Sequence, residues 1–422
     1  MIELDSLEQL DLAAHVRAGD GILFGQGTGE PLGLTQRLVE QRARYPGARI
    51  FFGSGFSKTF APEHADCLQF TGIGAIGTLR KLAAAGALDP IPCHISSIEG
   101  LLREGIVRSD VVLLLVSPPN AQGQYSFGLV NDVVRTAISR ARVVIAEVSE
   151  HVPWTPCDQP LLASEITVAV RSGTRPLELP TAPFGDLEKR IAAHLQPFIA
   201  DRSTLQVGIG SVPEAIIAML GDRRELGIHS GMIGDSVVDL IEKGAVTNAH
   251  KGLDPGVSIS GVLFGTRQRL YRFADRNPAL RLCPTSYTHH SSTLSKLRRL
   301  VSINSALEVD LTGQVNAEAI GADHIGAVGG QVDFVRAAAL TGGVSIIAFA
   351  ATGRRGESKV VANLSGPVTT ARSDVDLIVT EHGVAQLRGR SLRERARAMI
   401  AIAAPEHRDG LLRQARAMWR EL

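Results

Sequence analysis

The sequence predicts an α/β fold made of two open, mostly parallel sheets that are covered by helices. Short β-branched runs alternate with glycine-rich turns and helical stretches along the whole chain. These runs are apolar at consecutive positions, as in the Val-Val-Leu-Leu-Leu-Val run at 111–116. A strand that is apolar on both sides is typical of a parallel sheet with helices on both faces, so these two observations predict the fold class.

In the N-terminal half the predicted order is strand, turn and helix, repeated. The run at 21–24 leads through a glycine turn into an amphipathic stretch at 32–45, which predicts a helix. A second helix is predicted at 128–140, between the last two strands of this half. The predicted strands are 21–24, 50–53, 111–116 and 143–148.

A domain boundary is predicted at 171–186, where three prolines and two glycines gather. It divides the chain into an N-terminal α/β domain at 1–180 and a C-terminal α/β domain at 187–422. The strand-and-helix rhythm then restarts. The elements predicted after the boundary are strands at 205–209, 226–229, 257–262, 300–303, 344–349 and 375–379, a helix that reaches Leu220, and an arginine-rich amphipathic helix pair at 391–421.

Composition excludes several classes of function. The 422 residues carry 44 Lys and Arg against 43 Asp and Glu, and only 5% are aromatic, so a nucleic-acid partner is not expected. No apolar run approaches the ~18 residues that span a membrane, and the acidic N-terminus lacks a signal-peptide pattern. The four cysteines stand apart, which predicts neither a disulfide framework nor a metal site. A cytoplasmic protein is therefore expected.

Three loops place glycines directly after an apolar run, at 25–31, 208–215 and 326–334. Glycine allows the backbone to approach a ligand closely and to point N–H groups at an anion. None of the loops has the Walker pattern or a GxGxxG pattern with its acidic partner. Each loop alone is equally well explained as a tight strand-to-helix turn. Together they favour a phosphate-bearing or thioester ligand.

Several longer motifs are recognisable. They are LQVGIGSVPEAI at 205–216, LGIHSGMIGDSVVDLIEKG at 226–244, VSINSALEVDLTGQVN at 301–316, GAVGGQVDF at 326–334 and VTTARSDVDLIVTEHGVAQL at 368–387. They resemble the acetyl-CoA hydrolase/transferase family, which includes 4-hydroxybutyrate and succinyl-CoA:acetate CoA-transferases. The N-terminal half agrees more loosely, through GTGEP at 27–31. The resemblance implies two related domains of the CoA-transferase type, CoA binding across their cleft, and a homodimer. It also implies acyl-CoA and a small carboxylate as substrates, with no bound cofactor.

The family's chemistry depends on a glutamate that attacks the acyl-CoA carbonyl and then carries CoA as a thioester. The position that the resemblance assigns to this glutamate is Gly231, which has no side chain. The neighbouring Ser230 is a candidate nucleophile, although relatives also carry Ser or Thr there, which favours a structural role.

The resemblance also implies an oxyanion hole. The backbone N–H of Gly330 is its expected first donor, and the family's asparagine amide maps onto His290. His290 is then a candidate oxyanion donor or acid–base residue, and the alternative is a surface histidine in a polar turn. The residues expected to bind CoA are Gly208, Gly210, Val328, Gly329, Gly330 and Gln331.

These observations predict an enzyme that acts on the CoA thioester of a small carboxylic acid by a variant mechanism, because the glutamate is missing. One alternative is an acyl-CoA decarboxylase or lyase, which needs an oxyanion hole but no nucleophile. A further alternative is a CoA-binding protein without catalysis. The intact GGQVDF loop at 329–334 counts against that last alternative.

Overall fold

The computed structural model describes residues 1–419. Over this range the chain folds into two compact units, each with its own hydrophobic core. Unit 1 comprises Met1–Pro180, Gly231–Asp235 and Val257–His290. Unit 2 comprises Thr181–Ser230, Ser236–Gly256 and the chain from Ser291 onward. Gly231 and His290 therefore belong to the unit that the N-terminal half begins.

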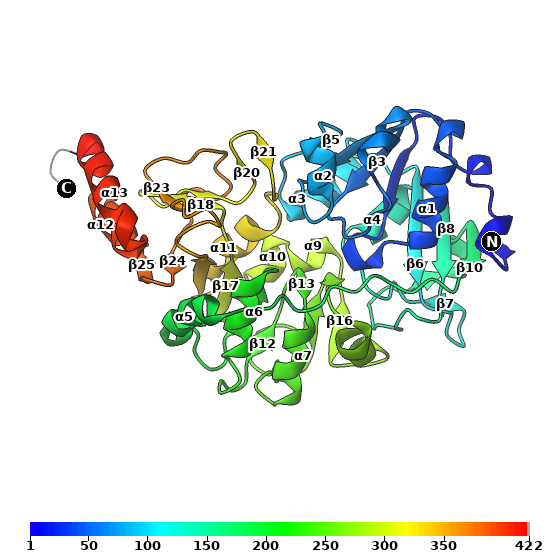
Figure 1. Ribbon diagram of the computed structural model, residues 1–422. Coiled ribbons are helices and arrows are strands. Elements are labelled where there is room, and N and C mark those ends of the chain that lie inside the picture. Colours follow the sequence, from blue (N-terminus) through cyan, green and yellow to red (C-terminus); the bar gives the residue numbers. More distant parts are fainter. Residues whose placement is uncertain (420–422) are drawn as a thin grey trace. The chain divides into compact units, whose positions relative to one another are not determined.

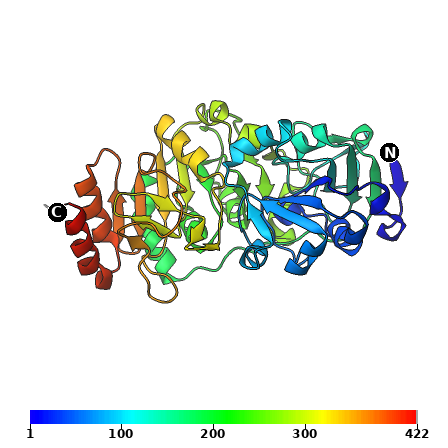
Figure 2. The same ribbon diagram turned by 90° about the horizontal axis from the view of Figure 1, so that it is seen from above.

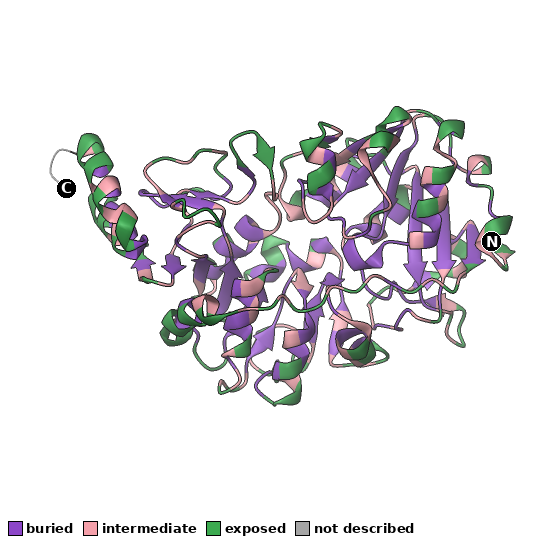
Figure 3. Cartoon of the chain, viewed as in Figure 1, coloured by how far each residue is buried: buried purple, intermediate pink, exposed green. Residues whose placement is uncertain are grey.

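Within the described residues, the main sheet of unit 1 has eight strands, all paired in parallel (Figure 1). In order across the sheet they are β1 (Ile2–Leu4), β10 (Val168–Arg171), β8 (Val143–Val148), β6 (Val111–Val116), β2 (Gly21–Phe24), β3 (Ala48–Phe52), β4 (Leu68–Gly72) and β5 (Leu88–Pro90). Every residue of β2 and β6 is buried, and Figure 3 draws β6 in purple. The predicted α/β class with a mostly parallel sheet is confirmed.

Three of the predicted N-terminal strands, β2, β6 and β8, have the expected bounds. The strand predicted at 50–53 begins earlier, at Ala48. The strands β1, β4, β5 and β10 were not predicted. In β4 every second residue is polar or small, and β5 ends at a proline, so neither has the continuous apolar run that marks the central strands.

The helix predicted at 32–45 is shorter than expected. The helix α1 (Leu32–Glu40) ends at Glu40, and the chain continues as the 3₁₀ turn η4 (Arg42–Arg44). The Tyr45 hydroxyl donates to the carbonyl of Leu38 at 2.6 Å, which folds this turn back against the helix. The other α-helices of the first 180 residues are α2 (Leu79–Ala84), α3 (Ile95–Arg103) and α4 (Val134–Arg140).

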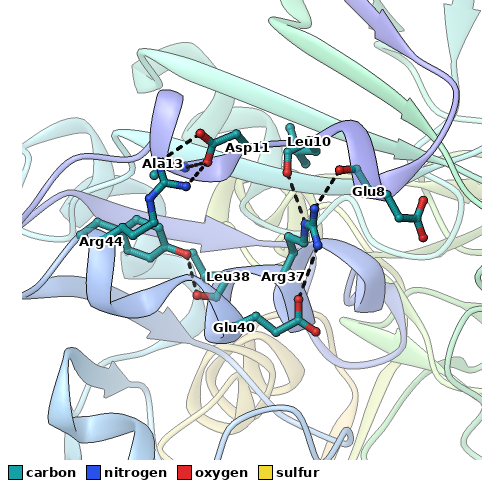
Figure 4. A network of polar contacts seen from close by, with 9 residues as sticks. Glu8, Leu10, Asp11, Ala13, Arg37, Leu38, Glu40 and Arg44 are labelled. Carbon is teal, nitrogen blue, oxygen red and sulfur yellow. Dashed lines mark hydrogen bonds and ion pairs between the residues drawn. The ribbon is translucent and has the colours of Figure 1, made fainter.

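Figure 4 shows how the N-terminal segment is fixed to α1 and η4. The Arg37 guanidinium donates to the carbonyl of Glu8 at 2.9 Å and to the carbonyl of Leu10 at 3.3 Å. The guanidinium of Arg44 forms a two-pronged ion pair with the Asp11 carboxylate, at 2.6 and 3.1 Å. The first contact satisfies backbone acceptors, whereas the second joins two exposed side chains.

The helix predicted at 128–140 is wrong in its first half. Gly128 has a φ of +64° and lies in a turn, in which the N–H groups of Leu129 and Val130 donate to the carbonyl of Phe127. Val130 forms an antiparallel bridge with Val262, and the backbone N–H of Asn131 donates to the carbonyl of Gly261. The apolar residues of this stretch thus pair with a segment more than a hundred positions away, and α4 begins only at Val134.

The later segments of unit 1 carry short elements. They are β13 (Met232–Ile233), β14 (Ser258–Ser260), β15 (Val262–Leu263), the π-helical turn η8 (Arg267–Tyr271), α8 (Arg272–Ala274), β16 (Leu280–Leu282) and α9 (Thr285–Thr288). The strand predicted at 257–262 is broken at Gly261, so β14 pairs with β16 while β15 pairs with β13.

The short helix α9 is fixed by two carboxyl residues of the N-terminal half. The buried Glu99 on α3 accepts the Thr285 hydroxyl at 2.7 Å and the Ser286 backbone N–H at 2.6 Å. It also accepts the Thr136 hydroxyl on α4 at 2.6 Å. Burial alone would raise the pKa of Glu99, but these hydrogen bonds outweigh it and hold the pKa below its usual value. An ionised Glu99 therefore joins α3, α4 and α9.

Asp132 lies beside this carboxylate, and its pKa is shifted in the opposite direction. Its backbone carbonyl accepts the Thr285 N–H, so it also anchors α9. Burial raises the pKa of its side chain to about 6, with a further rise from the Glu99 charge, although the N–H groups of Val133 and Val134 oppose it.

Unit 2 has its own sheet, with β12 (Gly227–Ile228), β11 (Thr204–Val207), β17 (Leu300–Asn304), β22 (Val344–Ala348), β24 (Leu377–Thr380) and β25 (Gly383–Gln386) in that order. Only the β24–β25 pair is antiparallel among these. The strands predicted in this half are confirmed with ends shifted by at most two residues, apart from the broken 257–262. A smaller sheet holds β19 (Val315–Asn316), β18 (Glu308–Asp310) and β23 (Val360–Val361), and a hairpin joins β20 (Ala319–Ile320) to β21 (Asp323–His324).

The helices of unit 2 include the predicted pair near the C-terminus, α12 (Leu392–Ile402) and α13 (Pro405–Met418), which lie side by side in red in Figure 2. Ser391 caps α12, with Glu394 completing a capping box. Positions 420 and 421 of the predicted pair lie outside the described residues. The other α-helices are α5 (Asp186–Leu195), α6 (Ser211–Ala218), α7 (Asp235–Glu242), which begins in unit 1, α10 (Ser291–Leu294) and α11 (Gln331–Leu340). In residues 1–419 no helix is both long and apolar enough to cross a membrane.

The N-terminal contacts predict unequal effects on stability. Arg37→Ala should lower the free energy of unfolding of unit 1 by about 1–2 kcal/mol, because it removes charge-assisted hydrogen bonds to two backbone carbonyls. Arg44→Ala removes only an exposed ion pair and should have a much smaller effect. Urea unfolding followed by circular dichroism measures both. An equal or larger loss in the Arg44 variant would contradict this assignment.

Asp132 predicts a pH dependence of stability. A raised carboxyl pKa in the folded state contributes stability below the unfolded pKa, near 4, and this contribution is lost as the pH rises through about 6. The free energy of unfolding of the wild type, measured relative to Asp132→Asn, should therefore fall by ~2 kcal/mol between about pH 4 and pH 7. Denaturant titrations of both proteins across this range measure it. A constant difference would show that Asp132 titrates normally.

Candidate active site

Gly231 lies in unit 1, directly before β13, in a closely packed backbone. Its carbonyl accepts the N–H groups of both Gly261 and Val262, each at 3.1 Å. The residue is partly exposed, while Ile233 further along the strand is buried. The backbone at this position is thus held by two hydrogen bonds.

The space in which a side chain at 231 would begin is occupied by His289. A Cβ built on Gly231 would lie 2.6 Å from both Cε1 and Nε2 of the His289 imidazole, closer than real Cβ contacts come. His289 is 6% exposed, and its Nδ1 lies 2.8 Å from the Thr288 hydroxyl. Glycine at 231 and histidine at 289 are therefore sterically matched.

His290 and Ser230 have different surroundings. His290 is exposed and follows α9, one residue beyond the buried His289. Ser230 is fully buried in unit 2, where its hydroxyl donates to the Val207 carbonyl at 3.2 Å and accepts the Val207 N–H at 3.3 Å. These two backbone contacts engage the Ser230 hydroxyl with β11.

Two of the glycines expected to bind CoA follow β11 in unit 2. The Gly208 N–H donates to the carbonyl of Ile303, and a Cβ on Gly208 would lie 3.7 Å from Oδ1 of Asn304. Gly210 stands at the N-terminal cap of α6. Its φ of +126° is a backbone conformation that residues other than glycine rarely adopt. A buried network of Gln206, Ser302 and Asn304 supports this end of β11 and β17.

The other expected CoA residues form the turn that enters α11 in unit 2. Gly329 has a φ of +61°, and a Cβ there would meet no atom within 4 Å. Gly330 caps α11 and has an ordinary φ of −93°. Val328 is partly exposed, while Gln331 is buried and donates its side-chain amide to the Thr370 hydroxyl at 2.9 Å. The loop thus offers open space at the N-terminus of a ten-residue helix, where N–H groups point outward.

Sequence reasoning missed His289, Glu99 and Asp132. The signal for His289 was the adjacent His-His pair, of which only the exposed member was chosen. Glu99 and Asp132 gave no local signal, because α9 joins them through tertiary contacts. Among the described residues, no group of three or more His, Cys, Asp or Glu side chains is placed to hold a metal ion.

Two family models match the chain. The acetyl-CoA hydrolase/transferase N-terminal domain matches residues 6–167, and the C-terminal domain of the same family matches residues 265–415. The chain is 38% identical over 402 residues to the 4-hydroxybutyrate coenzyme A transferase of Clostridium kluyveri, which covers 93% of both chains. It is also 38% identical over 349 residues to a succinyl-CoA:acetate/propanoyl-CoA:succinate CoA transferase of Fasciola hepatica, covering 81% of this chain and 72% of that one.

A solved structure agrees with these matches. The crystal structure of RipA from Yersinia pestis superimposes with a TM-score of 0.92 at 30% identity, over 98% of this chain and 97% of that one. The two family models, the sequence relatives and the solved structure agree with one another. The chain therefore belongs to the acetyl-CoA hydrolase/transferase family of enzymes that act on CoA thioesters.

Proposed function

We propose that this enzyme acts on the CoA thioester of a small carboxylic acid without forming an enzyme–CoA thioester at position 231. The observation that carries the proposal is the pairing of Gly231 with His289. Gly231 has no carboxylate to attack a carbonyl, and the imidazole fills the space in which such a side chain would begin. The surroundings of residue 231 thus fit a glycine and leave no room for a longer side chain while the imidazole stays in place.

The proposal places the thioester end of CoA at Val328–Gln331. Open space at Gly329 and the N-terminus of α11 support this placement, because backbone N–H groups there suit a developing oxyanion. Gly208 and Gly210 are proposed to contact CoA from the turn after β11. His290 remains a proposed oxyanion donor, and Ser230 is the less favoured nucleophile because its hydroxyl is engaged with Val207.

The acyl group is identified by incubating the enzyme with acetyl-, butyryl- and succinyl-CoA, with and without acetate, followed by mass spectrometry of the products. Release of free CoA, transfer of CoA to acetate and loss of CO₂ are distinguished by mass. The cytoplasmic location and the homodimer stay predictions from the sequence, and light scattering of the purified protein tests the latter.

The proposal predicts that no covalent enzyme–CoA adduct forms at residue 231. Wild-type enzyme quenched during turnover should carry no CoA adduct in its intact mass, because residue 231 has no nucleophile. The matched comparison is the double variant Gly231→Glu with His289→Gly, which supplies a carboxylate and clears the imidazole from its path. Gly231→Glu alone should be destabilised by the clash. A CoA adduct on wild-type protein would contradict the proposal, and peptide mapping would locate the true nucleophile.

The second prediction concerns CoA binding. We expect acyl-CoA to bind with a Kd on the order of micromolar and Gly330→Val to raise that Kd at least about tenfold. The φ of Gly330 suits any residue, so the loss should come from the branched side chain obstructing the ligand. Gly173→Val is the control, since a side chain there meets open space in an exposed loop. Calorimetry measures all three proteins. If Gly330→Val and wild type bind acyl-CoA with equal affinity, the proposed placement of CoA at this loop is wrong.

A further inference from the structure

A cavity of unit 2 lies at the opposite edge of its sheet from the glycine loops that are proposed to bind CoA. It has a volume of about 720 Å³ and is lined by residues that precede β11, β12 and β17, three strands that run in parallel. Gly208 follows the far end of β11, and Asn304 ends β17. The C-terminus of α11 is at the cavity's edge of the sheet, because the Arg299 N–H donates to the carbonyl of Thr341. Gly330 is at the other end of this ten-residue helix, about 15 Å along its axis.

Arginine is the commonest residue in the lining of this cavity, which we call the arginine cavity. It is lined by four arginines and two carboxyl residues, together with apolar residues that include Pro197 and Ala200. The charged residues are Asp201, Arg202, Arg223, Arg224, Glu225 and Arg299. An excess of one charge in a concave surface attracts ligands of the opposite charge. The volume is in the range of small-molecule sites, so a small anion is the expected kind of ligand.

Two of the arginines hold the walls of the cavity in place. The Arg223 guanidinium donates to the carbonyl of Gln196 at 2.7 Å and to the carbonyl of Ile199 at 2.8 Å. Arg202 forms an ion pair with Glu225 at 2.7 Å, and this contact is the main cause that lowers the pKa of the Glu225 carboxyl. The donors of these two side chains thus have partners within the protein.

The other two arginines leave their charge open to a ligand. Within residues 1–419, the guanidinium groups of Arg224 and Arg299 form no hydrogen bond and no ion pair. Neither carboxylate of the cavity pairs with them, because Glu225 binds Arg202 and Asp201 accepts the backbone N–H of Arg224 at 2.9 Å. Two cations that line one cavity repel each other, and an anion that contacts both removes this repulsion.

The backbone around the arginine cavity gives an independent observation. Among the described residues, six other than glycine have a positive φ, and three of these line the cavity: Arg202 at +65°, Glu225 at +56° and Arg299 at +49°. Such left-handed residues cluster at functional sites. Arg299 is held in this conformation because its N–H donates to Thr341 and its carbonyl accepts the Thr204 N–H, both at 3.1 Å. Glycine would form the same turn more easily, so the presence of arginine indicates that its side chain is needed.

We propose that the arginine cavity binds a small ligand that carries a diphosphate group, at a site separate from that of the acyl-CoA substrate. A guanidinium group binds phosphate oxygens through two parallel N–H groups, so Arg224 and Arg299 suit two linked phosphates. Inorganic pyrophosphate and a nucleoside diphosphate both supply this group. In the second case the apolar surface of Pro197 and Ala200 would contact the nucleoside.

The test is calorimetric titration of the full chain with pyrophosphate, ADP and orthophosphate, each as a separate probe. We expect pyrophosphate to bind with a Kd on the order of 10–100 micromolar and orthophosphate at least about tenfold more weakly. The affinity should fall as salt is added, because the contacts are ionic. Tighter binding of ADP than of pyrophosphate identifies a nucleotide ligand, and equal binding identifies the diphosphate alone.

Two variants remove the open charges without disturbing the fold. Arg299→Gly deletes a guanidinium and suits the left-handed backbone, so the melting temperature should not fall. Arg224→Ala deletes the other guanidinium. Each should raise the Kd for pyrophosphate about tenfold or more, which is the usual contribution of a hydrogen bond to a charged group. The matched control is Arg397→Ala, since Arg397 is exposed on α12 and has no hydrogen bond or ion pair within the described part of the chain.

The inference is overturned if wild type binds neither pyrophosphate nor ADP, or if orthophosphate binds as tightly as pyrophosphate. It is also overturned if folded Arg224→Ala or Arg299→Gly keeps the wild-type Kd, or if the Arg397→Ala control loses as much affinity. A last titration is made in the presence of saturating acetyl-CoA. Loss of pyrophosphate binding there would assign the cavity to the diphosphate of CoA and overturn the separate site. The products formed from acyl-CoA test the proposed function by themselves, so it stands in each of these cases.

Discussion

The steric exclusion between residue 231 and the His289 imidazole is the constraint on which the candidate site depends. A single methyl group at 231 would lie within 2.6 Å of two ring atoms, so the residue must be glycine as long as the ring stays where it is. The ring stays because α9 is tied to Glu99 and Asp132. A carboxylate on α3 thereby contributes to which residue is tolerated directly before β13, in a different segment of the chain.

The proposed function separates the fold of this enzyme from its chemistry. The sheets, the glycine-rich turns and the entry to α11 need no particular residue at 231, because Gly231 lies in unit 1 and α11 in unit 2. One fold can host different reactions, since the reaction depends on the residues of the site rather than on the fold.

Much of the fold was predictable from the sequence, because central strands such as β2 and β6 are short continuous apolar runs, which are typical of a parallel sheet covered on both faces. The strand β4 was missed because every second residue is polar or small, and β5 because it ends at a proline. The segment 128–133 was misassigned because its partner, β15, lies far away in sequence. The position of Gly231 within a motif was likewise readable. The steric match between Gly231 and His289 was not predictable, because nothing in the order of residues shows that His289, rather than His290, lies against Gly231.

The discontinuous composition of unit 1 has a consequence for how the protein is made. The ribosome completes the first 180 residues, which hold all eight strands of the main sheet, well before it reaches 257–290. Until then Val130, Thr28 and Glu99 lack the partners that Val262, Leu263 and Thr285 later provide. Unit 1 can therefore complete its folding only after the beginning of unit 2 and residues 257–290 have been synthesised. Until then part of the apolar surface of the nascent N-terminal half stays uncovered. Many proteins of this size fold one domain after another during translation. This chain does not follow that order, because unit 1 is completed by residues that are synthesised after unit 2 has begun.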